Sequence, residues 1–146
     1  MRCKLNNTGF TLVELIAVIV VIAALSVTVV QRLIPASSYQ LQGARDQLVT
    51  AFQSAQQLAM VRTAAVRLTT SGSQIDILED TDNDGVPDTS VTIAGQNYPL
   101  TLAAAATLSS ASFDFDRLGH TSSAAVVVSA GSSSVNVNVS ATGYIY

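Results

Sequence analysis

The spacing of hydrophobic residues changes twice along the 146-residue chain. The first segment is almost continuously apolar, and between Leu15 and Val30 only Ser26 and Thr28 are polar. With residues 10–13 added, the run reaches about 20 residues, which as a helix is long enough to span a bilayer. The pattern therefore predicts a membrane-spanning helix over residues 10–35, which Pro35 should kink or end.

Beyond Pro35, apolar residues recur at helical spacing, which predicts an amphipathic helix over residues 36–63. Ser37 and Ser38 are candidate caps for its start. The residues that recur at this spacing, and form the expected packing face, are Leu41, Ala44, Leu48, Ala51, Phe52, Ala55, Leu58, Ala59 and Arg62. The expected polar face consists of Gln42, Arg45, Gln47, Gln53, Gln56 and Gln57. We expect the apolar face to lie on a C-terminal sheet. Arg45 and Asp46 either form ion pairs with neighbouring subunits in an assembly or are solvated surface charges. We favour solvated charges, because exposed ion pairs contribute little to stability.

Residues 64–146 form the third segment, and their pattern predicts strands. Residues 65–70 and 74–78 flank a Ser-Gly-Ser turn and indicate a hairpin. Residues 124–128 and 135–139 flank a turn at Gly131, and three valines alternate with two asparagines in the second of these runs. Residues 90–115 are expected to be mostly strand, and 143–145 a short terminal strand. A helix followed only by strands predicts the α+β class.

The composition supports this division and excludes some functions. Only 12% of the residues are charged and there is no tryptophan, which suits short strands of small side chains. The single cysteine, Cys3, allows no intramolecular disulfide. The net charge of −3 gives no support for nucleic-acid binding. Arg2 and Lys4 precede the apolar run, so we expect a cytoplasmic N-terminus and a translocated C-terminal part.

Glu14 is the unusual residue of the apolar run, because a carboxylate in lipid is costly and is normally paired. Gly9 is equally informative, because an ordinary secretory signal places its small residue after the apolar core and not before it. Cleavage after Gly9 would create a new amine at Phe10, about one helical turn from Glu14. That amine could pair with the Glu14 of its own chain or of a neighbouring parallel helix.

The stretch KLNNTGFTLVELIAVIVVIAAL resembles the class III signal of type IV pilins and type II secretion pseudopilins. The resemblance implies that a prepilin peptidase cleaves after Gly9 and methylates Phe10, and that Phe10 and Glu14 pair during assembly. Loss of the leader, residues 1–9, would leave five arginines against ten acidic residues, a formal charge of −5. The alternative is a simple signal anchor in which the glutamate has no role.

The C-terminal segment resembles the minor pilins of the GspH/FimT type. In its length, its lack of a mature disulfide and its acidic loop, the chain resembles the minor pilins of mannose-sensitive haemagglutinin (MSHA) pili. The matching parts are FDFDRLG at 113–119 and AVVVSAGSSSVNVNVSATGYI at 125–145. Family members often carry a proline-containing F-x-P-x-G step in this motif. This chain has Asp116, Arg117 and Leu118 in its place. The resemblance implies a long N-terminal helix packed on an antiparallel β-sheet.

The acidic loop, residues 79–91, contains the run DTDNDGVPD. Alternating carboxylates followed by a glycine are typical of loops that bind calcium. The candidate Ca²⁺ ligands are Asp80, Asp82, Asp84, Asp88 and the carbonyl of Val86. The twelfth position of the loop is Val91 and not glutamate, so this is no EF-hand. The alternative is a solvated acidic turn, because Asp, Asn and Gly favour turns in any case.

No group of residues indicates an enzyme. His120 is the single histidine of the sequence, and no cysteine nucleophile lies near it. Asp114 and Asp116 alternate with Phe113 and Phe115, whose rings are expected to pack in the core.

Three functions follow from these patterns. The first is a minor pilin of an MSHA-like type IV pilus, which acts in filament initiation and assembly. The second is a minor pseudopilin of a type II secretion system, and the third a monomeric membrane-anchored module that binds calcium or another ligand. The expected partners are the prepilin peptidase, other pilin or minor pilin subunits, and the inner membrane before assembly, with no nucleic acid. The expected location is the inner membrane with a periplasmic C-terminal domain, and then the filament.

Overall fold

The computed structural model of the chain describes residues 11–33, 36–102 and 106–146, and the side chains of residues 26–33 and 36 are not described. The chain divides into two compact units, Met1–Pro35 and Ala36–Tyr146. The predicted cleavage site at Gly9 and Phe10 and the predicted helix break at Pro35 lie outside the described residues. Each unit is described by itself below.

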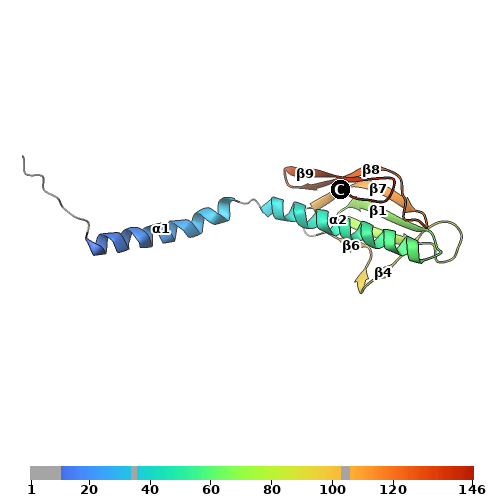
Figure 1. Cartoon of the computed structure of the whole chain (residues 1–146), viewed down its shortest axis with the longest axis horizontal. Coiled ribbons are helices and arrows are strands. Elements are labelled where there is room, and N and C mark those ends of the chain that lie inside the picture. Colours follow the sequence, from blue (N-terminus) through green and yellow to red (C-terminus); the bar gives the residue numbers. More distant parts are fainter. Residues whose placement is uncertain (1–10, 34–35, 103–105) are drawn as a thin grey trace, which may run out of the picture. The chain divides into compact units, whose positions relative to one another are not determined.

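The first unit contains one helix, α1, which spans Leu12–Leu33 (Figure 1). Thr11 caps its N-terminal end, because the Thr11 Oγ1 accepts a hydrogen bond of 3.3 Å from the backbone N–H of Glu14. The side chains of residues 11–25 are all exposed within this unit.

Across the described residues, no helix combines the length and the hydropathy needed to cross a membrane.

The second unit packs helix α2, Ala36–Val61, on an antiparallel sheet (Figure 1). The sheet has seven strands in the order β3-β2-β1-β7-β8-β9, with β6 also paired to β2. A separate ribbon, β4–β5, stands outside this sheet. The strands are β1 (Val66–Gly72), β2 (Gln74–Glu79), β3 (Thr89–Ser90), β4 (Thr92–Ile93), β5 (Gln96–Asn97), β6 (Leu100–Thr101), β7 (Ala106–Phe115), β8 (Ala124–Ala130) and β9 (Ser133–Val139).

The core of this unit lies between α2 and one face of the sheet. Phe52 of α2 packs edge-on against Phe113 and Phe115 of β7, with ring centroids 4.8 Å and 6.1 Å away. Every described residue of the core cluster falls between Ala44 and Ile145. The unit therefore contains its whole described core, and we expect residues 36–146 to fold without α1. The predicted α+β class, and the predicted packing of the two phenylalanines, are confirmed.

The two predicted hairpins are also confirmed. β1 pairs with β2 and β8 pairs with β9, both antiparallel. The turn of the second hairpin contains Gly131, whose φ of 61° is accessible to glycine at little cost. In β9, Val137 and Val139 are buried and Asn136 is exposed, as the alternation predicts.

One strand prediction needs correction. The segment 143–145 forms no strand, only an isolated bridge between Ile145 and Val139. The chain makes a tight turn here, in which the Gly143 N–H bonds to the Ser140 carbonyl. Residues 90–115 are mostly strand in the described part of the range, as expected, and they form the short strands β4, β5 and β6 and the long strand β7.

Candidate functional site

Glu14 lies in the first turn of α1, and the structure gives it a role that the sequence analysis missed. Its backbone N–H bonds to Thr11 Oγ1, so Thr11-Leu-Val-Glu14 matches the start of a capping box. The T-x-x-E spacing was the available signal for this cap. A carboxylate here also interacts favourably with the positive end of the helix dipole. The helix dipole is therefore a second reason, beside charge pairing, for an acidic residue at this position.

One face of α1 carries an exposed apolar stripe that begins at Glu14. The other residues of the stripe follow at helical spacing: Ala17, Val18, Val21 and Ile22. Small and branched apolar side chains on one stripe are suited to packing against a neighbouring apolar helix.

Three carboxylates converge in the acidic loop, as the calcium hypothesis requires. One oxygen from each of Asp80, Asp82 and Asp84 lies within 4.8 Å of the others. Asp80 is buried, and its carboxylate accepts backbone hydrogen bonds from Asp84 at 3.2 Å and from Gly85 at 2.9 Å. Oxygen atoms gathered in this way are the ligands that a hard cation such as Ca²⁺ prefers.

The other two predicted ligands are placed differently. Asp88 lies outside the three-carboxylate group and accepts a hydrogen bond of 3.1 Å from the Thr89 hydroxyl. Val86 is half-exposed, and its N–H donates to Asp84 Oδ1 at 2.8 Å. The structure therefore brings together three of the five predicted ligands through their side chains.

The remaining acidic residues and the histidine have local structural partners. Asp114 forms an ion pair with Arg67 across β7 and β1. Asp116 accepts backbone hydrogen bonds from His120 at 2.8 Å and Leu118 at 2.9 Å. These bonds, the one from His120 first, lower the pKa of the Asp116 carboxyl. His120 is exposed beside Asp116, so this pair stabilises a surface turn.

Gln56, expected on the polar face of α2, contacts two loops through its side chain. Its Nε2 donates to the Gly119 carbonyl at 3.0 Å and to the Thr142 carbonyl at 3.2 Å. The side chain thereby ties α2 to two loops that are distant in the sequence. Helical spacing alone carries no signal for such a bridge, because the partners come from the tertiary fold.

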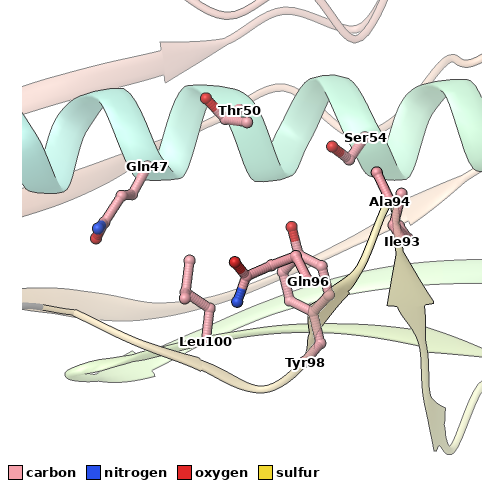
Figure 2. Close-up of a pocket in the computed structure, with 8 residues that line it drawn as sticks. All are labelled: Gln47, Thr50, Ser54, Ile93, Ala94, Gln96, Tyr98 and Leu100. Carbon is pink, nitrogen blue, oxygen red and sulfur yellow. The ribbon is translucent and has the colours of Figure 1, made fainter.

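A pocket of about 290 Å³ lies between α2 and the ribbon (Figure 2). Its lining is Gln47, Thr50 and Ser54 from α2, together with Ile93, Ala94, Gln96, Tyr98 and Leu100. The Tyr98 hydroxyl is hydrogen-bonded with Ser54, and burial raises the pKa of this phenol. None of the lining residues is charged.

Comparison with known proteins accounts for both units of the chain. Residues 44–143 match the family model described as type II transport protein GspH. The chain belongs to the GspH family. Residues 4–30 match the prokaryotic N-terminal methylation motif, which implies processing by a prepilin peptidase and contact with other pilin subunits. This member of the GspH family is therefore a pilin-like subunit, either a minor pilin of a type IV pilus or a minor pseudopilin of type II secretion.

Two solved structures share the fold of this GspH-family chain, and both are crystal forms of the Pseudomonas aeruginosa type IV minor pilin FimU. The first has a TM-score of 0.53 and 17% sequence identity, over 75% of this chain and 88% of FimU. The second has a TM-score of 0.50 and 15% identity, over 72% and 90%. At these identities the comparison shows the fold alone. No curated protein matches the sequence significantly.

Proposed function

We propose that this chain is a minor pilin of an MSHA-like type IV pilus and acts in filament initiation and assembly. The methylation motif over residues 4–30, joined to a GspH-type domain, carries the proposal. The segments at 113–119 and 125–145 resemble minor pilins of the GspH/FimT type, and the acidic loop resembles that of MSHA minor pilins. The similarity of the fold to FimU, a type IV minor pilin, adds support.

The proposed mechanism begins in the inner membrane, with residues 10–35 in the bilayer and residues 36–146 in the periplasm. The prepilin peptidase cleaves after Gly9 and methylates Phe10. Neighbouring subunits then align their apolar helices so that Glu14 of one chain meets the Phe10 amine of another. Because an unpaired carboxylate is costly in lipid, this pairing favours docking in register. The apolar stripe that begins at Glu14 offers a surface for such a helix.

The alternative is a minor pseudopilin of a type II secretion system. The description of the matching family as a type II transport protein favours it. The type IV pilus and the type II secretion system use the same kind of subunit. The test must therefore determine which of the two assemblies needs this chain.

Deletion of the gene, with surface pili imaged and secreted proteins assayed in the same strain, is that test. Loss of pili with normal secretion supports the minor pilin. Loss of secretion with normal pili overturns it in favour of the pseudopilin. If both remain normal, the filament role fails and a membrane-anchored calcium-binding module becomes the better hypothesis.

We further propose that the acidic loop binds Ca²⁺ through Asp80, Asp82 and Asp84, with Asp88 and the Val86 carbonyl as additional ligands. Three carboxylate oxygens within 4.8 Å of one another support this. Such a group repels itself when no cation is present, so binding should stabilise the loop.

A further inference from the structure

The two ends of the seven-stranded sheet are protected to different degrees. At one end, β3 consists of only two residues, Thr89 and Ser90, and Asp88 precedes them. Short edge strands and edge charges are devices that prevent further strands from adding to a sheet. At the other end, β9 has seven residues and contains no proline, no charged residue and no bulge (Figure 1). The β9 edge therefore lacks the usual protection.

The C-terminal tail of the chain covers only a part of the β9 edge. The Asn138 N–H donates to the Tyr146 carbonyl at 2.9 Å, and the Tyr146 N–H donates to the Asn138 carbonyl at 3.0 Å. Both backbone groups of Asn138 therefore point away from β8. Because this direction alternates along an antiparallel strand, the N–H and C=O groups of Asn136 and Ser134 also point away from β8.

These outward groups of Asn136 and Ser134 have no backbone partner among the described residues. Both residues are exposed, whereas Asn138 is half-buried beside Tyr146. A regular row of unpaired N–H and C=O groups is a template for one more strand, because an extended chain offers acceptors and donors at the same repeat. The open part of the edge is therefore suited to an extended peptide segment.

The side chains of β9 define which segment would fit. Val135 lies between Ser134 and Asn136, is half-buried and packs against the core. An added strand places its own side chains alternately on the same two faces. The residue opposite Val135 should therefore be apolar and extend the core, and the residues opposite Ser134 and Asn136 should be small or polar.

We propose that an extended segment of a different subunit adds to the β9 edge as an antiparallel strand opposite residues 133–137. The inference rests on the proposed subunit function and deepens it by naming a contact surface. The methylation motif implies contact with other pilin subunits, and a minor subunit is surrounded by subunits of other kinds. Antiparallel pairing repeats the exchange of two bonds between Asn138 and Tyr146, and it is the more stable arrangement.

Photo-cross-linking of the full chain in living cells tests the contact. The photoreactive amino acid p-benzoylphenylalanine at position 134 should form an adduct with a different subunit that carries its own methylation motif. Mass spectrometry should map the adduct to a segment in which apolar and polar residues alternate. The control places the same amino acid at Ser112, which is exposed on the interior strand β7, and should give no such adduct. An adduct with another copy of this chain alone, an equal adduct from position 112, or no adduct would each overturn the proposal.

Proline at position 136 provides the second measurement. Asn136→Pro removes one outward N–H and obstructs the added strand, but at an edge position it leaves the ladder between β8 and β9 intact. Asn136→Thr changes the same side chain and keeps the N–H. Asn136→Pro should reduce the yield of the adduct from position 134 by at least about fivefold, the effect of one lost hydrogen bond. Asn136→Thr should retain the yield, and equal yields for the two variants would overturn pairing through the backbone.

Thermal unfolding of residues 36–146 separates a lost contact from a lost fold. Asn136→Pro and Asn136→Thr should unfold at the same temperature. If the proline variant is less stable, Ser134→Pro removes the other outward N–H and replaces it, with the photoreactive group at position 136. The adduct can form in a pilus or in a secretion system, so it does not depend on which assembly contains the chain. An adduct that survives the proline overturns the edge contact alone, whereas normal pili and normal secretion after gene deletion overturn the subunit function.

Discussion

Arg62 binds the buried carboxylate of Glu79 and thereby connects the end of α2 to the end of β2. Its Nη1 lies 2.8 Å from Oε1 and 2.6 Å from Oε2 of Glu79. Glu79 is only 5% exposed, whereas the Arg62 side chain is half-exposed. The next residue, Asp80, is the first carboxylate of the acidic loop. The ion pair therefore holds the base of the candidate calcium site to the helix.

Arg62→Ala should reduce the free energy of unfolding by about 1–3 kcal/mol, because it leaves a buried carboxylate without its partner. Urea unfolding of residues 36–146 measures this. Arg45→Ala, on the same helix, is the matched control and should change stability by less than about 0.5 kcal/mol. Equal effects of the two substitutions would show that the ion pair contributes nothing specific.

Gly143→Ala should destabilise the same unit by at least about 2 kcal/mol. Gly143 has a φ of 77°, and a Cβ there would lie 2.5 Å from Nε2 of Gln56 and come too close to the Gly119 carbonyl. The substitution thus strains the backbone and disturbs the bridge that Gln56 makes between two loops. Thermal unfolding of purified residues 36–146 gives the difference.

Gly43→Ala is the opposite case and serves as its control. Gly43 lies within α2, and a Cβ there would meet nothing within 4 Å. Alanine should therefore stabilise the unit by about 0.5–1 kcal/mol, through helix propensity alone. If both Gly43→Ala and Gly143→Ala reduced stability, the argument that only Gly143 is constrained by its backbone and neighbours would be wrong.

Glu14→Gln should impair filament assembly, whereas Thr11→Ala should leave assembly largely intact. Glutamine retains the capping-box residue type but removes the charge that is proposed to pair with the Phe10 amine. Thr11→Ala removes the cap and keeps the charge. Membrane fractionation should show normal insertion of both variants, and imaging of the filaments measures assembly. The reverse result would assign Glu14 a capping role and refute charge pairing.

Calcium at about 10 mM should stabilise residues 36–146 by about 1.5–2.5 kcal/mol, if the loop has the weak affinity typical of extracellular modules. Asp82→Ala should abolish this gain and slightly stabilise the calcium-free protein, because it relieves repulsion among three carboxylates. Asp46→Ala, which removes an acidic residue of α2, should leave the gain unchanged. Calorimetry that detects no calcium heat in the wild type would refute the site.

The chain sequence alone was sufficient for those features that depend on neighbouring residues. The spacing of Leu48, Phe52 and Ala55 identified the buried face of α2, and the alternation in β9 identified its inward side. Turn residues such as Gly131 identified the hairpins. The carboxylates of the acidic loop also converge locally, because alternate residues of one short turn supply them.

Only the tertiary structure decided the features that join distant residues. Arg62 and Glu79, Gln56 and its two carbonyl partners, and the pocket beside the ribbon all depend on how α2 lies on the sheet. The direction of a side chain such as Gln56 is set by the partners available after packing, which no local pattern contains.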